Sequence, residues 1–295
     1  MYYDTITDYL HDTFNLFLEE IDGMSSLCDL RNVSFESGKL PDYTNRAQAL
    51  LYCLRYHFGY AFEYEYIYRN HILNSFDSEQ INVLSIGCGN GIDLWALDHA
   101  IQKSGSQIRH INYMGVDRVD WKEYFDCSLD GHVKYIQCEI TELQEQFENI
   151  DVLILPKSIS ELRQEDLVHL ADIIDQCTNE LYVVASFREE SYNINVDSKM
   201  FAGLIAMLEY NGFEISEGHP KDICSIAESR GILSISDDYK YPDDVKNYLL
   251  NLSSVCLEKA EDDAECQILC PQKLSRSPIL RTDHIRYNIV KIRRR

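Results

Sequence analysis

Residues 81–94 read INVLSIGCGNGIDL, and this stretch constrains the fold of the whole chain. Its first six residues are mostly β-branched or apolar and predict a buried strand, whereas residues 92–101 read as a helix. Three glycines lie between the two elements. Glycine is needed where the backbone turns sharply and comes close to a ligand, and the positive end of the following helix then faces negative charge. The stretch therefore predicts a strand, a ligand-binding turn and a helix.

The spacing of the glycines is GxGxG. A dinucleotide-binding fingerprint has its third glycine one position later, where this chain has Ile92. The pattern resembles motif I of the class I S-adenosylmethionine (SAM)-dependent methyltransferases. This resemblance implies that Gly87, Cys88, Gly89 and Gly91 contact SAM.

Further matches to that family follow in order along the chain. A second predicted strand ends at Asp117, where the family uses a carboxylate to accept both ribose hydroxyl protons, and Arg118 comes next as a candidate cofactor contact. Residues 133–140 predict a third strand. The resemblance implies that Glu139 and Ile140 at its end flank the adenine, although the family often has Asp in place of Glu139.

A fourth predicted strand covers residues 150–155 and leads into the motif IV region, which in the family faces the reacting methyl group. Leu155 and Pro156 are therefore candidate cofactor contacts. Asp93 lies just after the glycine turn and is expected to cap the helix that faces the methionine end of SAM. Arg55, on a predicted N-terminal helix, is a candidate partner of the methionine carboxylate or a surface arginine.

The motif IV sequence at residues 155–161 is LPKSISE, which departs from the Asn/Asp-Pro-Pro-Tyr of enzymes that methylate base or glutamine nitrogens. Such targets are disfavoured. Lys157 is a candidate base if burial lowers its pKa, or a site for an anion, and Glu161 can remove a proton or bind a cation. Ser158 completes the candidate catalytic set. Ser158 and Glu161 also read as a capping box for a helix through residues 167–174.

The remaining elements complete an α/β pattern. The predictions are a strand at 181–187, a helix at 198–210, a strand at 213–216, a helix near 243–257 and a last strand at 286–292. We therefore predict a doubly wound, mostly parallel seven-stranded sheet with an N-terminal helical lid. The strand order 3-2-1-4-5-7-6 and the antiparallel last strand come from the resemblance, whereas the alternation of strands and helices comes from the residues.

The N-terminal quarter reads as helical at residues 3–21 and again from a cap at Thr44 or Asn45 to about residue 73. The second helix carries tyrosines at every fourth position from 52 to 68, which turn about 40° per step and cannot all face one site. They form either a packing face or part of a lid. The predicted divisions are a helical lid at 1–77, a SAM-binding core at 78–217, an insertion at 218–284, and a final strand and basic tail at 285–295.

The charge of the chain is unevenly distributed. Residues 273–295 hold eight Lys or Arg and one Asp, a net charge of +7, so the rest of the chain carries −29. An acid-rich body repels phosphate backbones and favours small-molecule, cationic or protein partners. The basic tail can hold RNA, an anionic substrate or the acidic surface of the chain itself.

Ten cysteines lie mostly within apolar patterns and read as reduced core thiols. Cys256, Cys266 and Cys270 with His284 match no common zinc spacing, so no metal is expected. No apolar run is long enough to span a bilayer and no secretory signal is seen, so a cytoplasmic protein is expected.

The resemblance implies a SAM-dependent methyltransferase, and the acidic body with its aromatic helix favours a small molecule whose oxygen or nitrogen accepts the methyl group. Two alternatives stay open. One is an RNA methyltransferase that uses the basic tail at 273–295, and the other is a non-catalytic SAM-binding regulatory or scaffold protein. An aminopropyl transferase is more remote, because the paired carboxylates of that group are absent at motif IV.

Overall fold

The computed structural model describes residues 5–24, 26–33, 42–121, 133–144, 147, 149–188, 191–225, 239–256, 265–281 and 285–295. The chain divides into two compact units. Unit 1 comprises residues 1–2, 63–230 and 282–295, and unit 2 comprises residues 3–62 and 231–281.

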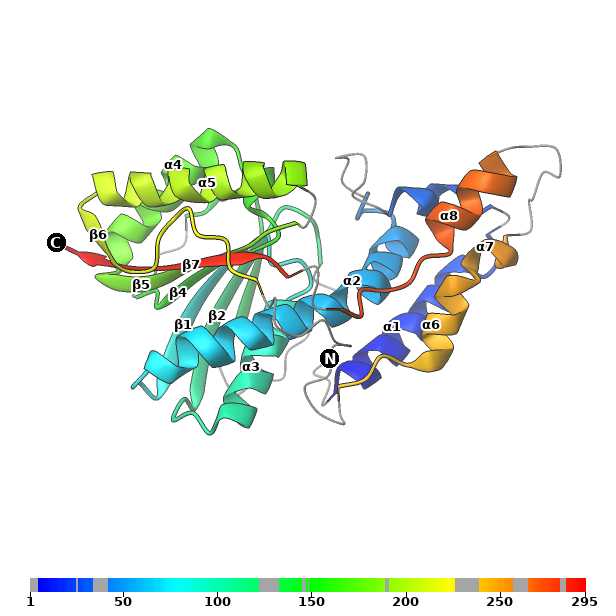
Figure 1. Cartoon of the computed structure of the whole chain (residues 1–295), viewed down its shortest axis with the longest axis horizontal. Helices are drawn as coiled ribbons and strands as arrows, with labels where there is room; N and C mark the ends of the chain where they lie inside the picture. Colours follow the sequence, from blue (N-terminus) through cyan, green and yellow to red (C-terminus); the bar gives the residue numbers. More distant parts are fainter. Residues whose placement is uncertain are drawn as a thin grey trace. The chain divides into compact units, whose positions relative to one another are not determined.

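Unit 1 is built on a seven-stranded sheet in the order β3-β2-β1-β4-β5-β7-β6 (Figure 1). The strands are β1 (Gln80–Ile86), β2 (His110–Asp117), β3 (Val133–Gln137), β4 (Val152–Pro156), β5 (Glu180–Ser186), β6 (Phe213–Glu217) and β7 (Tyr287–Arg294). The first five strands pair in parallel, whereas β7 is antiparallel to both β5 and β6. The predicted fold class and strand order are confirmed, and they are those of the class I methyltransferase fold.

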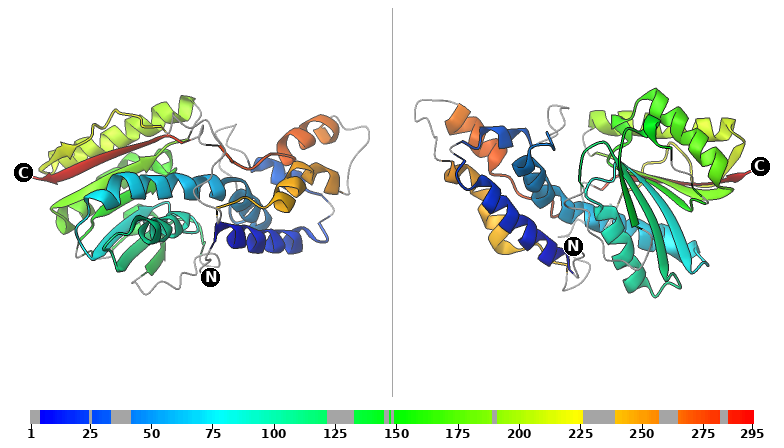
Figure 2. Two further views of the ribbon diagram at one scale, coloured as in Figure 1. Left: turned by 60° about the horizontal axis from the view of Figure 1, so that its bottom comes forward. Right: turned by 180° about the vertical axis from the view of Figure 1, so that it is seen from behind.

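Helices cover both faces of this sheet, which explains its sequence pattern. Helices α4 (Gln164–Cys177) and α5 (Ser191–Tyr210) lie on one face, and α3 (Ile92–Ser104) lies on the other (Figures 1 and 2). Strands buried on both faces read as continuous apolar runs, as the sequence of β4 does. Its residues 152–155 are all buried, and Leu153 and Leu155 pack into the core with residues of α4 and α5.

Two element ends differ from the sequence prediction. Strand β3 stops at Gln137, because residues 140–142 form a 3₁₀ turn in place of further strand. The long second helix, α2, spans Arg46–Ile67 and continues as a π-helical turn at Tyr68–Ile72. The predicted cap is confirmed at Asn45, whose Oδ1 accepts the backbone N–H of Gln48 at 3.1 Å.

Unit 2 joins two segments that are far apart in the sequence. It contains α1 (Ile6–Ile21), most of α2, α6 (Asp243–Leu250), α7 (Leu252–Val255) and α8 (Cys270–Leu274). Two tyrosines from the late segment, the buried Tyr239 and the half-buried Tyr241, fix its register on α2. The Tyr239 hydroxyl donates to the Phe58 carbonyl at 2.6 Å, and the Tyr241 hydroxyl donates to the Leu54 carbonyl at 2.7 Å.

The boundary between these two units falls inside α2, between Phe62 and Glu63. The residues predicted as an insertion at 218–284 largely complete the N-terminal helical unit. At Gly59 a Cβ atom would lie 2.6 Å from Ile279 Cγ2, so this glycine is required for close packing of the two segments. Among the described residues no helix has the length and hydropathy needed to cross a membrane.

Candidate functional site

The glycine turn lies at the carboxyl end of β1, where the strand order changes direction between β1 and β4. In open α/β sheets ligands bind at this point. Gly87, Gly89 and Gly91 all have positive φ, of 70°, 56° and 79°. L-amino acids other than glycine are strained in this region, so the turn requires glycine at each position. The turn leads directly into α3, whose first N–H groups therefore point towards the same end of the sheet.

The three glycines have different surroundings. A Cβ atom on Gly87 would overlap that of Ser158, so Gly87 lets the loop after β4 approach the turn. A Cβ atom on Gly89 would meet no atom of the described residues within 4 Å. The backbone of Gly89 is therefore the part of the turn that a ligand can approach closely.

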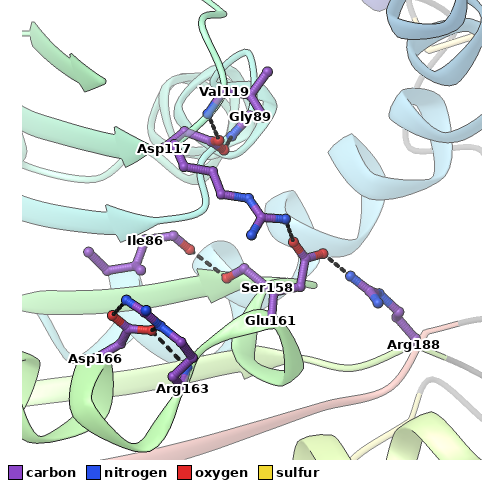
Figure 3. Close-up of polar contacts among 10 residues, drawn as sticks. Ile86, Gly89, Asp117, Val119, Ser158, Glu161, Arg163, Asp166 and Arg188 are labelled. Carbon is purple, nitrogen blue, oxygen red and sulfur yellow. Dashed lines mark hydrogen bonds and ion pairs between the residues drawn. The ribbon is translucent and has the colours of Figure 1, made fainter. Parts of the chain in front are cut away.

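Asp117, at the end of β2, is held beside the turn by backbone groups (Figure 3). Its Oδ2 accepts the Gly89 N–H at 2.9 Å, and its Oδ1 accepts the Val119 N–H at 2.9 Å. Each carboxylate oxygen retains acceptor capacity after one such bond. Burial raises the pKa of Asp117 to about 6, against the opposing effect of the two N–H groups. The carboxyl group is thus oriented by the turn that it adjoins.

Asp93 follows the turn at the second residue of α3. Its side chain is fully buried, and both carboxylate oxygens lie 2.9 Å from the hydroxyl of Tyr113, which donates to them. Burial raises the pKa of Asp93 to about 6. Cys88 is also buried, and burial raises the pKa of its thiol well above its ordinary value. Contacts of Asp93 and Cys88 side chains with a cofactor stay predictions.

The prediction that Ser158 and Glu161 form a capping box is wrong. The Ser158 hydroxyl donates instead to the Ile86 carbonyl at 2.5 Å, which ties the motif IV loop to the end of β1 (Figure 3). Residues 159–161 form a 3₁₀ turn, and α4 begins later, at Gln164. Its N-terminal cap is at Arg163, whose backbone N–H donates to Asp166 Oδ2 at 2.7 Å. The Ser-x-x-Glu pattern is local, whereas the close approach of Ser158 to the glycine turn is a tertiary contact.

The Lys157 side chain is buried, and its ammonium group contacts both Glu63 and the carbonyl of Phe187. Its Nζ lies 2.9 Å and 2.7 Å from the two carboxylate oxygens of Glu63, and it donates to the Phe187 carbonyl at 2.7 Å. Its backbone has φ of 58°, an unusual value for a residue other than glycine. Burial lowers the pKa of Lys157 and raises that of Glu63 to about 7, while their mutual attraction opposes both shifts. A catalytic role for Lys157 stays a prediction, and its observed contacts fix the loop.

Glu161 is bound by two arginines from neighbouring loops. Its Oε1 accepts from the Arg188 guanidinium, and its Oε2 lies 3.5 Å from Nη2 of Arg118 (Figure 3). The Arg188 N–H donates to Asp197 Oδ2 at 3.0 Å. Burial raises the pKa of Glu161, and the two guanidinium groups lower it. The loops after β2, β4 and β5 therefore meet at this carboxylate.

The remaining residues that were predicted to contact the cofactor lie in the hydrophobic core, at element ends or in unit 2. Leu155 and Ile140 belong to the hydrophobic core, Pro156 ends β4, and Glu139 is exposed at the N-terminal end of a 3₁₀ turn. Arg55 lies in unit 2 and is 2 % exposed. Its guanidinium donates to backbone carbonyls of unit 2, those of Val33, Lys273 and Leu274, at 2.6 to 3.1 Å. These contacts give Arg55 a structural role, and its contact with a cofactor remains only a prediction.

Sequence reasoning missed three charged residues of this region, namely Glu63, Arg188 and Asp197. Each lies on or beside a predicted apolar element, and Glu63 and Asp197 are almost fully buried. A charged residue on the buried face of an amphipathic element is the signal that points to such groups, because ionised side chains are seldom buried without a partner. No cluster of three metal-ligating side chains occurs in the part of the chain that the structure describes. His284 of the proposed zinc set lies outside that part.

No protein-family model matches the chain, and no curated protein matches its sequence. Solved structures with a similar fold include the plantazolicin methyltransferase BpumL in complex with SAH, with 14 % identity over 95 % of this chain and 100 % of that chain and a TM-score of 0.44. A TehB-like SAM-dependent methyltransferase from Corynebacterium glutamicum has 14 % identity over 53 % and 75 % of the two chains, with a TM-score of 0.36.

The [4+2]-cyclase SpnF is also similar, with 14 % identity over 73 % of this chain and 75 % of that chain and a TM-score of 0.39. These TM-scores and identities are low. The functional interpretation therefore depends on the strand order, the glycine turn and the carboxylate of this chain.

Proposed function

We propose that the protein binds SAM at the glycine turn and transfers the methyl group to an oxygen or nitrogen of a small molecule. The single observation that supports this most is the Asp117 carboxylate, held by the Gly89 N–H at the switch point of the sheet. The carboxylate fits a ribose diol, because each of its oxygens can accept one more hydrogen bond. The backbone of Gly87, Gly89 and Gly91 fits the methionine end of SAM.

SAM supplies an electrophilic methyl group when bound, and the residues of this chain orient the reactants around it. Asp117 would hold the ribose hydroxyls, and the N–H groups at the start of α3 would face the methionine carboxylate. Methyl transfer is an in-line displacement, so positioning supplies much of the rate enhancement. The contacts of Lys157 and Ser158 give the motif IV loop a fixed position, as such positioning requires.

Calorimetric titration of SAM and S-adenosylhomocysteine (SAH) tests the cofactor. We expect binding near 1 μM, and Asp117→Ala should weaken it about tenfold, or about 1.4 kcal/mol. Exposed Asp120 lies on the same loop, and Asp120→Ala is the matched control for the loss of one negative charge. Equal effects of the two substitutions, or no binding by the wild type, would contradict the proposed site.

The small-molecule acceptor is supported by charge. The chain has a net charge of −22, and three of its basic C-terminal residues are paired with its own acids. Lys291 Nζ lies 2.9 Å from Glu180, and Arg293 and Arg294 pair with Glu214 and Asp175 at 2.7 Å and 2.6 Å. These ion pairs leave less of the positive charge of residues 273–295 available to bind RNA.

Incubation with tritiated SAM and separate small-molecule, RNA and protein fractions identifies the acceptor class. Label in the small-molecule fraction is expected. Label in RNA, lost as salt rises, would favour the RNA methyltransferase instead. Tight SAH binding with no label in any fraction would favour the non-catalytic regulatory protein.

A further inference from the structure

Three charged side chains meet at the carboxyl edge of the sheet. Glu161 lies in the turn after β4, Arg118 follows β2, and Arg188 follows β5 (Figure 3). Both guanidinium groups converge on one carboxylate. We refer to these three residues as the arginine clamp.

The two arginines of the clamp differ in exposure. The Arg188 side chain is 16 % exposed and donates closely to Glu161, whereas that of Arg118 is 48 % exposed and lies 3.5 Å from Glu161. Glu161 itself is 25 % exposed. The contact with Arg118 is therefore the looser and the more exposed of the two.

Other charged groups lie around the clamp. Lys157 and Glu63 neutralise each other in a buried pair. Asp197 is fully buried, accepts the backbone N–H of Arg188 and interacts electrostatically with Arg188 and Glu161. Asp117 interacts in the same way with Arg118 and Glu161. The most exposed charged group of the clamp is the Arg118 guanidinium.

This geometry selects a chemical class. A guanidinium group has a planar fork of donors that matches the two oxygens of a carboxylate. The clamp already binds such a group, that of Glu161, whereas a cation at the same place would meet two positive charges. We propose that Arg118 and Arg188 form a subsite for a carboxylate of the methyl acceptor, and that Glu161 occupies it when the acceptor is absent. This inference rests on the proposed function in placing the acceptor at this edge.

Three matched probes test the subsite, namely benzoate, benzamide and benzylamine, which share a ring and differ in charge. Dissociation constants are measured by ligand-observed NMR with and without saturating SAH. We expect benzoate to bind at least fivefold more tightly than benzamide, and benzylamine to bind most weakly. The titrations without SAH still report on the clamp if the cofactor does not bind. Loss of SAH binding would count against the proposed function, and equal binding of benzoate and benzamide would count against the subsite.

Substitutions with opposite effects separate recognition from stability. Glu161→Gln removes the competing carboxylate and should strengthen benzoate binding about tenfold, whereas Arg118→Gln should weaken it at least fivefold. If the clamp had only a structural role, Glu161→Gln and Arg118→Gln would both weaken benzoate binding. Arg163 is an exposed arginine that pairs with Glu165 and Asp166, so Arg163→Gln is the matched control and should leave benzoate binding unchanged. Tightest binding of benzylamine, abolished by Glu161→Gln, would overturn the proposal in favour of an amine acceptor.

Discussion

Breaking the buried ion pair of unit 1 should destabilise that unit strongly. The side chains of Lys157 and Glu63 are 8 % and 2 % exposed, and Nζ lies within 2.9 Å of both carboxylate oxygens. Removing one partner of such a pair leaves a buried charge without compensation and typically costs about 3 to 5 kcal/mol. We therefore expect Lys157→Met or Glu63→Gln to lower the free energy of unfolding by about 3 kcal/mol or more.

The double variant Lys157→Met, Glu63→Gln should recover a large part of this loss, because neither charge then remains buried. An exposed ion pair would contribute only about 0 to 1 kcal/mol, so the magnitude separates the two cases. The cycle of single and double variants gives the coupling energy directly. Neither substitution removes an atom of the Ser158 contact with Ile86.

Tryptophan fluorescence during urea unfolding is the suitable assay. The chain has two tryptophans, Trp95 and Trp121, and both lie in unit 1, so the signal does not report on unit 2. A single-variant loss below about 1 kcal/mol, or additive single-variant losses, would refute the reasoning. The conservative exchange Lys157→Arg is a useful further control, because it keeps the charge but alters the geometry.

Two more predictions concern the glycine turn and the carboxyl group beneath it. Gly87→Ala should cost more than about 3 kcal/mol because it adds overlap with Ser158 to the strain of positive φ, whereas Gly89→Ala should cost only about 1 to 2 kcal/mol of strain and yet abolish SAM binding. Equal losses of unfolding free energy in Gly87→Ala and Gly89→Ala would contradict this prediction. Burial raises the pKa of Asp93 from 3.8 to about 6, so its contribution to stability is fully present below pH 3.8 and is lost as pH rises to about 6. The free energy of unfolding of Asp93→Asn should therefore rise relative to that of the wild type over this pH range, by about 2 kcal/mol. If urea unfolding gave parallel pH profiles of this free energy for the two proteins, the effect would be excluded.

Those parts of the fold that depend on neighbouring residues could be predicted before the structure was known. The strand, glycine turn and helix at residues 80–104 follow from local backbone preferences, since glycine alone adopts the required positive φ without strain. The end of a second strand at Asp117 follows from the apolar run before it, whereas the place of that strand beside β1 came from the resemblance. Alternation of strands and helices limited the fold to a doubly wound sheet.

Only the tertiary structure decided which side chains meet across the chain. Lys157 and Glu63 are 94 residues apart, and Arg55 and Lys273 are 218 residues apart. Such pairs leave no local periodicity, so Ser158 read as a helix cap although it binds the end of β1. The joining of residues 3–62 with 231–281 into one unit was hidden for the same reason. Apolar periodicity shows that a face is buried, but the partner that covers it is selected by packing over the whole fold.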